Sequence, residues 1–233
     1  MAGHGLHTRG MMRRNNMLKA ATYLFLEHGY EKTTTTQIAK AAGMSQASFF
    51  AAFESKEAIL LELTKIMFSS QFLAAESMIP SGDPLLLYAL ETGLQLHITE
   101  LSEPLRELYV TTYSLSSTSE FVYQSTTGKL MPIFGPYLPD AREHDFYELE
   151  IASASVTRGF MARPCDLYFT LDRKLTRYYT CCFQIYRVPE DVYRPVIDTA
   201  LEYDLRSDAE KFIAAIVQRA ESGFEQINTK EGE

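Results

Sequence analysis

The stretch GMSQASFFAAFESK, residues 43–56, decides how the first part of this chain folds. Gly43 breaks the preceding helix, Ser45 is placed to cap the next one, and three phenylalanines follow at spacings that a helix brings together. Upstream, Thr34 and Gln37 form a capping box that opens a short helix. Two short helices joined by a glycine turn predict a helix-turn-helix.

This motif requires small and apolar residues at defined places, and the sequence supplies them. Ala39 lets the two helices cross closely. The apolar set that holds the second helix in place is Ile38, Ala42, Met44, Phe49 and Phe53. A rigid second helix of this kind fits the major groove of DNA. Short helical corners are common in all-α proteins, so the motif alone leaves a purely structural corner as the alternative.

The segments on both sides of the motif also have helical patterns. Apolar residues three and four apart predict a helix over residues 11–28, which Gly29 ends as a left-handed C-cap, and residues 1–10 are expected to form a tail. Ser55 is placed to cap a long helix that extends to Met78.

A second group of signals organises the rest of the chain. The segment PSGDP, residues 80–84, is the clearest internal break, with Asp83 as the N-cap of the next helix. Beyond it the helical periodicity continues, Ser117 and Ser207 are expected to cap helices, and alternating strand patterns are absent from the sequence. The expected fold class is all-α.

Charge is distributed unevenly along the chain. The net charge is −8, yet residues 1–56 contain seven basic and three acidic residues, while residues 57–233 contain 15 basic and 27 acidic residues. A basic first quarter on an acidic body is typical of a polyanion-binding module joined to a different kind of domain. We therefore expect an N-terminal tail and helix-turn-helix domain in residues 1–56, and a larger helical domain in residues 57–233.

Composition argues against several classes of protein. Of the 233 residues 46% are hydrophobic, and no apolar run approaches the roughly 18 residues of a membrane span, so a soluble, cytoplasmic protein is expected. Cys165, Cys181 and Cys182 have the spacing of neither a disulfide framework nor a zinc site. The sequence lacks nucleophile, phosphate-loop and dinucleotide motifs, which predicts a protein that is not an enzyme and needs no cofactor or metal.

Residues 13–61 closely resemble the DNA-binding region of TetR-family transcriptional regulators. The matching run is RRNNMLKAATYLFLEHGYEKTTTTQIAKAAGMSQASFFAAFESKEAILL, in which AATYLF, GYEKTT, IAKAAGMS and SKEAIL carry the resemblance. The resemblance implies an all-helical homodimer whose N-terminal domain binds double-stranded operator DNA. It also implies that the larger domain binds a small molecule and the partner subunit, and that repression is the commoner mode of action.

The resemblance and the chemistry of base edges together select the residues expected to contact DNA. An amide such as Gln46 pairs with an adenine edge, and a methyl group such as that of Ala47 fits a thymine methyl. The complete set is Arg13, Arg14, Thr35, Thr36, Ser45, Gln46, Ala47, Ser48, Phe50 and Lys56. Phe50 and Ala52 stand where the family usually has tyrosine and often has histidine, so the affinity for DNA is expected to be lower.

Aromatic and polar residues after the motif are candidates for a ligand pocket. The set is Met67, Phe68, Gln71, Phe72, Tyr109, Tyr113, Phe121, Phe134 and Phe160. Their composition predicts a largely apolar pocket with a few hydroxyl anchors, suited to a hydrophobic or aromatic effector. For any one of them, packing in the core is the alternative. No pattern in the sequence indicates a pair of buried acidic residues.

The expected assembly and mechanism follow from the same resemblance. Residues 170–187 and 208–226 are expected to form the dimer interface, because their apolar faces are wider than a monomer core requires. The long helix after Ser55 is expected to transmit ligand binding to the DNA-binding domain. The resulting hypothesis is a repressor released by a small effector. The alternative is a helical ligand-binding or protein-interacting dimer that has lost operator binding.

Overall fold

Eleven α-helices and one short 3-10 helix make up the regular structure, and the described residues contain no β-strand, which confirms the all-α class. The computed structural model describes the backbone of residues 3–78 and 82–228, and the side chains of residues 10–68 and 82–227. The helices are α1 (Gly3–His28), α2 (Thr35–Ala41), α3 (Gln46–Ala52), α4 (Lys56–Met78), α5 (Pro84–Leu101), α6 (Glu103–Thr112), α7 (Ser116–Phe134), η1 (Gly135–Tyr137), α8 (Glu143–Ala162), α9 (Leu171–Ile185), α10 (Glu190–Glu202) and α11 (Leu205–Asn228).

The helix signals in the first part of the chain lie where the sequence predicts them. Gly29 follows α1 with a φ of 85°, the left-handed conformation expected of a C-cap glycine. The capping box of α2 is complete, since the Gln37 amide donates to Thr34 Oγ1 (3.2 Å) and the Thr34 amide to Gln37 Oε1 (2.7 Å). The Ser45 hydroxyl accepts from the Ser48 amide (3.2 Å) at the start of α3.

The start of α1 differs from the expected one. α1 begins at Gly3, so the expectation of a tail over residues 1–10 is wrong for residues 3–10. No proline interrupts this stretch, and once a helix exists each further residue adds one backbone hydrogen bond. At the other end of the motif, Ser55 caps α4 as expected by accepting from the Ala58 amide (3.1 Å).

Two of the expected caps in the larger domain are wrong. α7 begins one residue before Ser117, whose hydroxyl instead donates to the carboxylate of Glu57 on α4. α11 begins upstream of Ser207, because Asp204 accepts from the Ser207 amide (3.1 Å) and Leu205 is already buried. In both cases a tertiary contact or an earlier acceptor overrides the local capping pattern.

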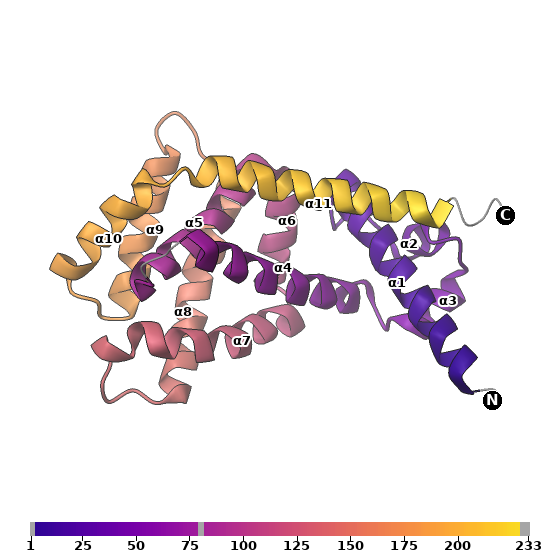
Figure 1. Ribbon diagram of the computed structural model, residues 1–233, viewed down its shortest axis with the longest axis horizontal. Helices are drawn as coiled ribbons and strands as arrows, with labels where there is room; N and C mark the ends of the chain where they lie inside the picture. The colour runs from indigo at the N-terminus through magenta and orange to yellow at the C-terminus, as the bar shows by residue number, and fades with distance from the viewer. Residues whose placement is uncertain (1–2, 79–81, 229–233) are drawn as a thin grey trace.

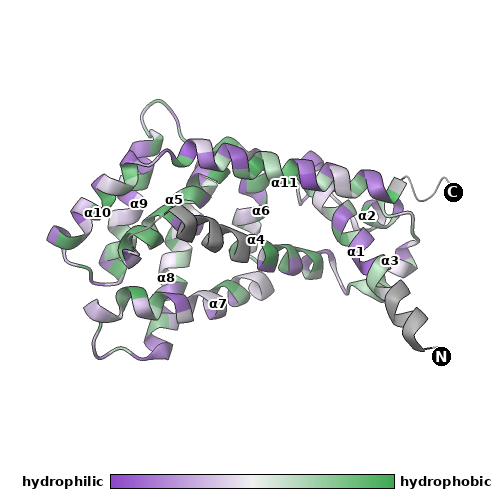
Figure 2. Ribbon diagram, viewed as in Figure 1, coloured by the Kyte–Doolittle hydropathy of each residue, from purple (hydrophilic) through white to green (hydrophobic). Residues whose placement is uncertain are grey.

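α5 is the central helix of the larger domain. It contacts α4, α6, α7, α8, α9, α10 and α11, and Figure 2 shows that hydrophobic residues run along it. A helix surrounded on all sides is expected to be apolar around most of its circumference. Gly93 is its point of closest approach, because a Cβ there would lie 2.0 Å from the Tyr179 hydroxyl and 2.9 Å from a methyl group of Leu205.

α11 connects the larger domain to the N-terminal domain (Figure 1). It packs on α5 and then along α1, where Phe224 stacks on Tyr23 with ring centroids 4.3 Å apart. Lys19 Nζ also donates to Gln226 Oε1 (2.8 Å). The N-terminal domain is therefore held by α11 in addition to its covalent link through α4.

The helices expected to form a dimer interface use their apolar faces to different extents within the chain. In α9, Leu175, Tyr179 and Cys182 are buried against the subunit's own core. In α11, which packs on α5 and α1, the apolar residues Phe212, Ile213, Ile216 and Val217 are only partly buried. The interface at residues 170–187 and 208–226 stays a prediction. No helix in the described part of the chain is long and apolar enough to cross a membrane.

Candidate nucleic-acid interface

α2 and α3 form a helix-turn-helix that packs on α1. Gly43, in the turn, has a φ of 68°, and Ala39 is buried where the helices meet. Phe49 and Phe53 are 0% and 3% exposed, whereas Phe50 is 54% exposed. Two of the three phenylalanines thus fix α3 against the domain, and the third lies on its outer surface.

The outer surface of α3 presents short polar and apolar side chains. Its exposed residues include Ser45, Gln46, Ala47 and Phe50, and Ser48 is partly buried with its hydroxyl 3.0 Å from that of Ser45. On α2, Thr36 is exposed and Thr35 is partly buried. Neither helix contains an acidic residue. This surface can accept and donate hydrogen bonds at base edges without repelling a polyanion.

Arg14 is engaged inside the N-terminal domain. Its guanidinium donates to the carbonyl of Ala52 (2.5 Å) and to the carboxylate of Glu62, and lies 4.1 Å from the centre of the Phe53 ring. These contacts join α1 to the end of α3 and to α4. Arg13, by contrast, is exposed on α1. Arg14 is therefore tied to α3 and α4 although its side chain remains partly exposed, and its contact with DNA stays a prediction.

Lys56 is also held by contacts within the domain. Its Nζ donates to the carbonyl of Tyr30 (2.7 Å) and lies 4.0 Å from the centre of the Tyr30 ring. Burial lowers the pKa of Lys56, although Glu31 and Glu107 oppose this effect. Burial, followed by the charges of Glu57 and Glu31, raises the pKa of Tyr30 to about 12. Lys56 thus fixes the start of α4 to the loop between α1 and α2.

Replacing Arg14 by methionine tests the structural role of its contacts. The variant Arg14→Met is expected to lose about 1 to 2 kcal/mol of unfolding free energy, since it loses one charge-assisted hydrogen bond to a carbonyl, a partly exposed ion pair and a cation–π contact. Chemical denaturation measures this loss. Arg13→Met removes the same charge from an exposed position and is the matched control. An equal loss in both variants would contradict the role of Arg14.

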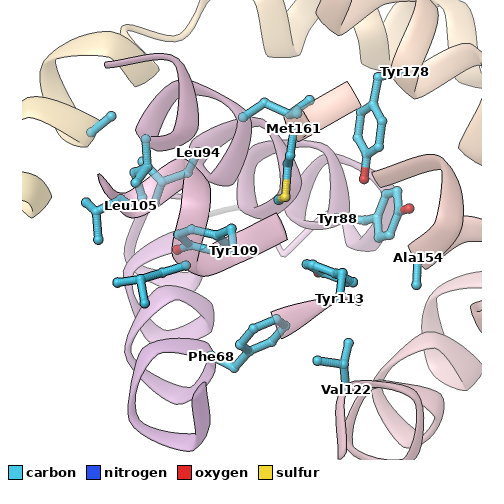
Figure 3. Close-up of a cluster of buried hydrophobic side chains, with 14 of the residues drawn as sticks. Phe68, Tyr88, Leu94, Leu105, Tyr109, Tyr113, Val122, Ala154, Met161 and Tyr178 are labelled. Carbon is cyan, nitrogen blue, oxygen red and sulfur yellow. The ribbon is translucent and has the colours of Figure 1, made fainter. Parts of the chain in front are cut away.

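A second candidate site is a cavity of about 50 Å³ inside the larger domain. It lies between α4, α5, α7, α8, α9 and Tyr113, which directly follows α6, and is large enough for a few water molecules. Phe68, Tyr88, Tyr113 and Tyr178 border it, and Figure 3 shows these four residues in one cluster of buried side chains. The other lining residues are Leu87, Glu91, Thr92, Gln95, Thr126, Lys129, Leu130, Ile133, Glu150, Ser153 and Thr157.

The structure brings few of the expected ligand residues to this cavity. Phe68 and Tyr113 line it. The side chains of Gln71 and Phe72 lie outside the described residues. The remaining expected residues lie elsewhere: Met67 packs against the core cluster, Tyr109 is fully buried, Phe134 stacks on Tyr186, Phe160 contacts Phe169 and Tyr178, and Phe121 is partly exposed near Lys65.

Two carboxyl groups in the cavity wall are absent from the expected set. Glu150, on α8, is 6% exposed, and Glu91, on α5, also lines the cavity. Burial raises the pKa of Glu150 to about 7, against hydrogen bonds from Ser153, Thr126 and Tyr186 that lower it, and the charge of Glu91 raises it further. Burial likewise raises the pKa of Glu91. The cavity wall is therefore more polar and more acidic than the largely apolar pocket that the sequence predicts.

Comparisons with known proteins concern mainly the N-terminal domain. Residues 17–63 match the family model of bacterial regulatory proteins of the tetR family. The HTH-type transcriptional regulator TcmR of Streptomyces glaucescens is 39% identical over 82 residues, covering 35% of this chain and 36% of that protein. An uncharacterized HTH-type transcriptional regulator of Bacillus subtilis (strain 168), YdgC, is 40% identical over 58 residues, covering 25% of this chain and 30% of that protein.

The matches to these curated relatives span about a third of their length. Among solved structures, a TetR-like transcriptional regulator from Rhodococcus sp. RHA1 aligns over 74% of this chain and 94% of that chain, with 18% sequence identity and a TM-score of 0.47.

Proposed function

We propose that the chain is a member of the TetR family of bacterial regulators, whose family model residues 17–63 match, and that it is a homodimeric, cytoplasmic repressor that binds operator DNA and is released by a small molecule. The observation that carries the proposal is the outer surface of α3. Gln46, Ala47 and Phe50 are exposed there, while Phe49 and Phe53 are buried and hold the helix in a fixed position. A short, rigid helix with free polar side chains suits the major groove.

Two residue classes have separate roles in this proposal. Gln46 reads a base edge, which contributes specificity. Exposed Arg13 contacts phosphate, and so contributes to affinity for any duplex. Arg14 and Lys56, which are engaged within the domain, act by positioning the helices that make these contacts.

Fluorescence anisotropy with DNA from upstream of the protein's own gene, against a shuffled duplex, tests the proposal. Gln46→Ala is expected to weaken binding to the upstream duplex by about 1 to 3 kcal/mol and to leave binding to the shuffled duplex unchanged. Arg13→Ala is expected to weaken binding to both duplexes and to lower the salt slope by about 1.

Arg158→Ala, an exposed arginine of α8, is the control for loss of one positive charge. If the wild type binds both duplexes equally weakly, and a wider selection of random duplexes yields no preferred sequence, the operator-binding proposal is wrong. The chain would then be better described as a ligand-binding or protein-interacting dimer.

Release from DNA requires that ligand binding in the cavity changes the position of α3. α4 borders the cavity at Phe68 and begins at Lys56, next to the loop that leads into α2. α11 provides a second connection, since it packs on α5 and on α1. A ligand changes DNA affinity only if it binds one arrangement of these helices better than the other. Operator affinity that stays constant at saturating effector would exclude the release step.

A further inference from the structure

The cavity in the larger domain is bordered by carboxyl groups from two facing helices. Glu91 extends from α5 and Glu150 from α8, and Lys129 of α7 lies in the same wall. With both carboxyl groups ionised, two negative charges stand against one positive charge. The wall then carries a net charge of −1, so its electrostatic complement is a single positive charge.

The surroundings of Glu150 are organised around an anionic carboxylate. Ser153 donates to Oε2 (2.6 Å), Tyr186 donates to the same oxygen (3.1 Å), and Thr126 donates to Oε1 (3.0 Å). Three hydroxyl donors on one carboxyl group favour its charged form. Burial opposes that form unless a cation is nearby.

The chain does not supply such a cation at salt-bridge distance from Glu150 in the part that the structure describes. Lys174, another buried charged residue of the larger domain, differs from Glu150 because it pairs directly with Glu100 (2.8 Å) and also donates to the Arg163 carbonyl (2.5 Å). Glu150 thus has the donors that suit a carboxylate but lacks the ion pair that would offset its burial.

Aromatic rings complete the wall. Tyr88, Tyr113 and Tyr178 border the cavity together with Phe68. Aromatic faces attract cations as well as apolar groups, and the attraction is strongest where water is excluded. Neither a purely hydrophobic ligand nor a neutral polar ligand would compensate the net negative charge of the two carboxyl groups and Lys129.

We infer that this cavity binds a compact organic cation, a protonated amine whose ammonium group lies between Glu91 and Glu150 and whose carbon skeleton contacts the surrounding aromatic rings. The inference deepens the proposed function and rests on it for the role of the amine as effector. The cavity of about 50 Å³ accommodates only a small head group in its present form, so a larger amine requires movement of the surrounding helices. Because α4 and α5 border the cavity, this movement would transmit amine binding to these two helices.

Proton exchange accompanies binding in this arrangement. Glu150 loses its proton when the cation enters, so affinity rises with pH between 6 and 8, by at most about tenfold per pH unit. Other titratable or charged groups lie in the cavity wall or interact with Glu150 from the helices packed around it. They are Glu91, Tyr88, Tyr113, Lys129, Tyr178, Cys182 and Tyr186.

Isothermal titration calorimetry on the full chain with benzylammonium and n-butylammonium, each compared with the alcohol of the same skeleton, tests the inference. The wild type is expected to bind at least one ammonium compound about tenfold or more tightly than its alcohol. Glu150→Gln and Glu91→Gln are each expected to remove most of this preference. Glu148→Gln, an exposed residue of the same helix as Glu150, is the matched control and is expected to leave the preference unchanged.

The comparison of ammonium compound and alcohol in the wild type tests the inference by itself, because it does not require any of the variants to fold. Equal or tighter binding of the alcohols, or no binding of either ammonium compound at millimolar concentration, overturns the inference. Titration of operator DNA without any amine tests the proposed function separately. A chain that binds the amine and no DNA refutes the proposed function alone, and one that binds DNA and no amine refutes this inference alone.

Discussion

Replacing Gly93 by alanine is expected to lower the unfolding free energy by about 2 to 4 kcal/mol, although alanine is the better helix former. The added Cβ would lie 2.0 Å from the Tyr179 hydroxyl and 2.9 Å from Leu205. The Tyr179 hydroxyl donates to the Ala89 carbonyl (2.8 Å) in the buried core, so displacing it also breaks a hydrogen bond. Overpacking and loss of this bond together exceed the gain in helix propensity.

The double variant Gly93→Ala/Tyr179→Phe identifies the cause. Removing the hydroxyl leaves the Tyr179 ring carbon at 3.3 Å from the new Cβ, a distance that small shifts relieve. We therefore expect the double variant to be more stable than Gly93→Ala, with a coupling free energy of about 1 to 2 kcal/mol in a double-mutant cycle. Additive effects of the two changes would show that the contact with Tyr179 is not the source of the loss.

The close packing of Gly93 against Leu205 is also expected to affect the N-terminal domain. Leu205 is the first residue of α11, and α11 continues to α1, where Phe224 stacks on Tyr23. A change that displaces the start of α11 is therefore expected to alter the support of the helix-turn-helix. Hydrogen exchange of α1 amides in Gly93→Ala would reveal such an effect, with the double variant as the comparison.

Local helix signals could be predicted from the sequence because they depend on residues only a few positions apart. Thr34, Ser45, Ser55 and Asp83 all accept the backbone hydrogen bonds expected of them. Ser117 was a wrong prediction, since its hydroxyl contacts Glu57 on a different helix. A capping pattern cannot anticipate a partner that tertiary packing brings from elsewhere in the chain.

The same limit applies to the candidate DNA interface. The separation of Phe50 from Phe49 and Phe53 followed from helical spacing, and the structure confirms which of them are buried. The partners of Arg14 lie 38 and 48 residues away, and that of Lys56 lies 26 residues away. Such contacts leave no periodic signal, so a resemblance to DNA-binding residues was the only guide to these two cations.

The sequence gives no indication that the cavity is acidic. A glutamate on an amphipathic helix is most often solvated, so Glu91 and Glu150 were not distinguished from the other acidic residues. Phe146 and Ser153, which lie four residues before and three residues after Glu150 in the sequence, are both buried. Only the packing of α8 against its neighbours shows that this carboxyl group is buried.

Replacing Glu150 by glutamine is expected to change how stability depends on pH. Folding raises the pKa of Glu150 from its ordinary 4.5 to about 7, chiefly because the carboxyl group is buried. Between these two values the folded chain binds more protons at this group than the unfolded chain, so its stabilising contribution is complete below pH 4.5 and is lost as the pH rises through 7. The loss amounts to at most about 3 kcal/mol.

Glu150→Gln removes this titration while preserving the size of the side chain. Urea denaturation from pH 5 to pH 8 is expected to show a flatter profile for the variant, which becomes more stable than the wild type toward pH 8 because it has no buried charge to form. Glu148→Gln, exposed on the same helix, should retain the wild-type slope. Parallel profiles for the wild type and Glu150→Gln would mean that the carboxyl group ionises in the folded chain as readily as in water, and the acidic cavity would then lack its main electrostatic feature.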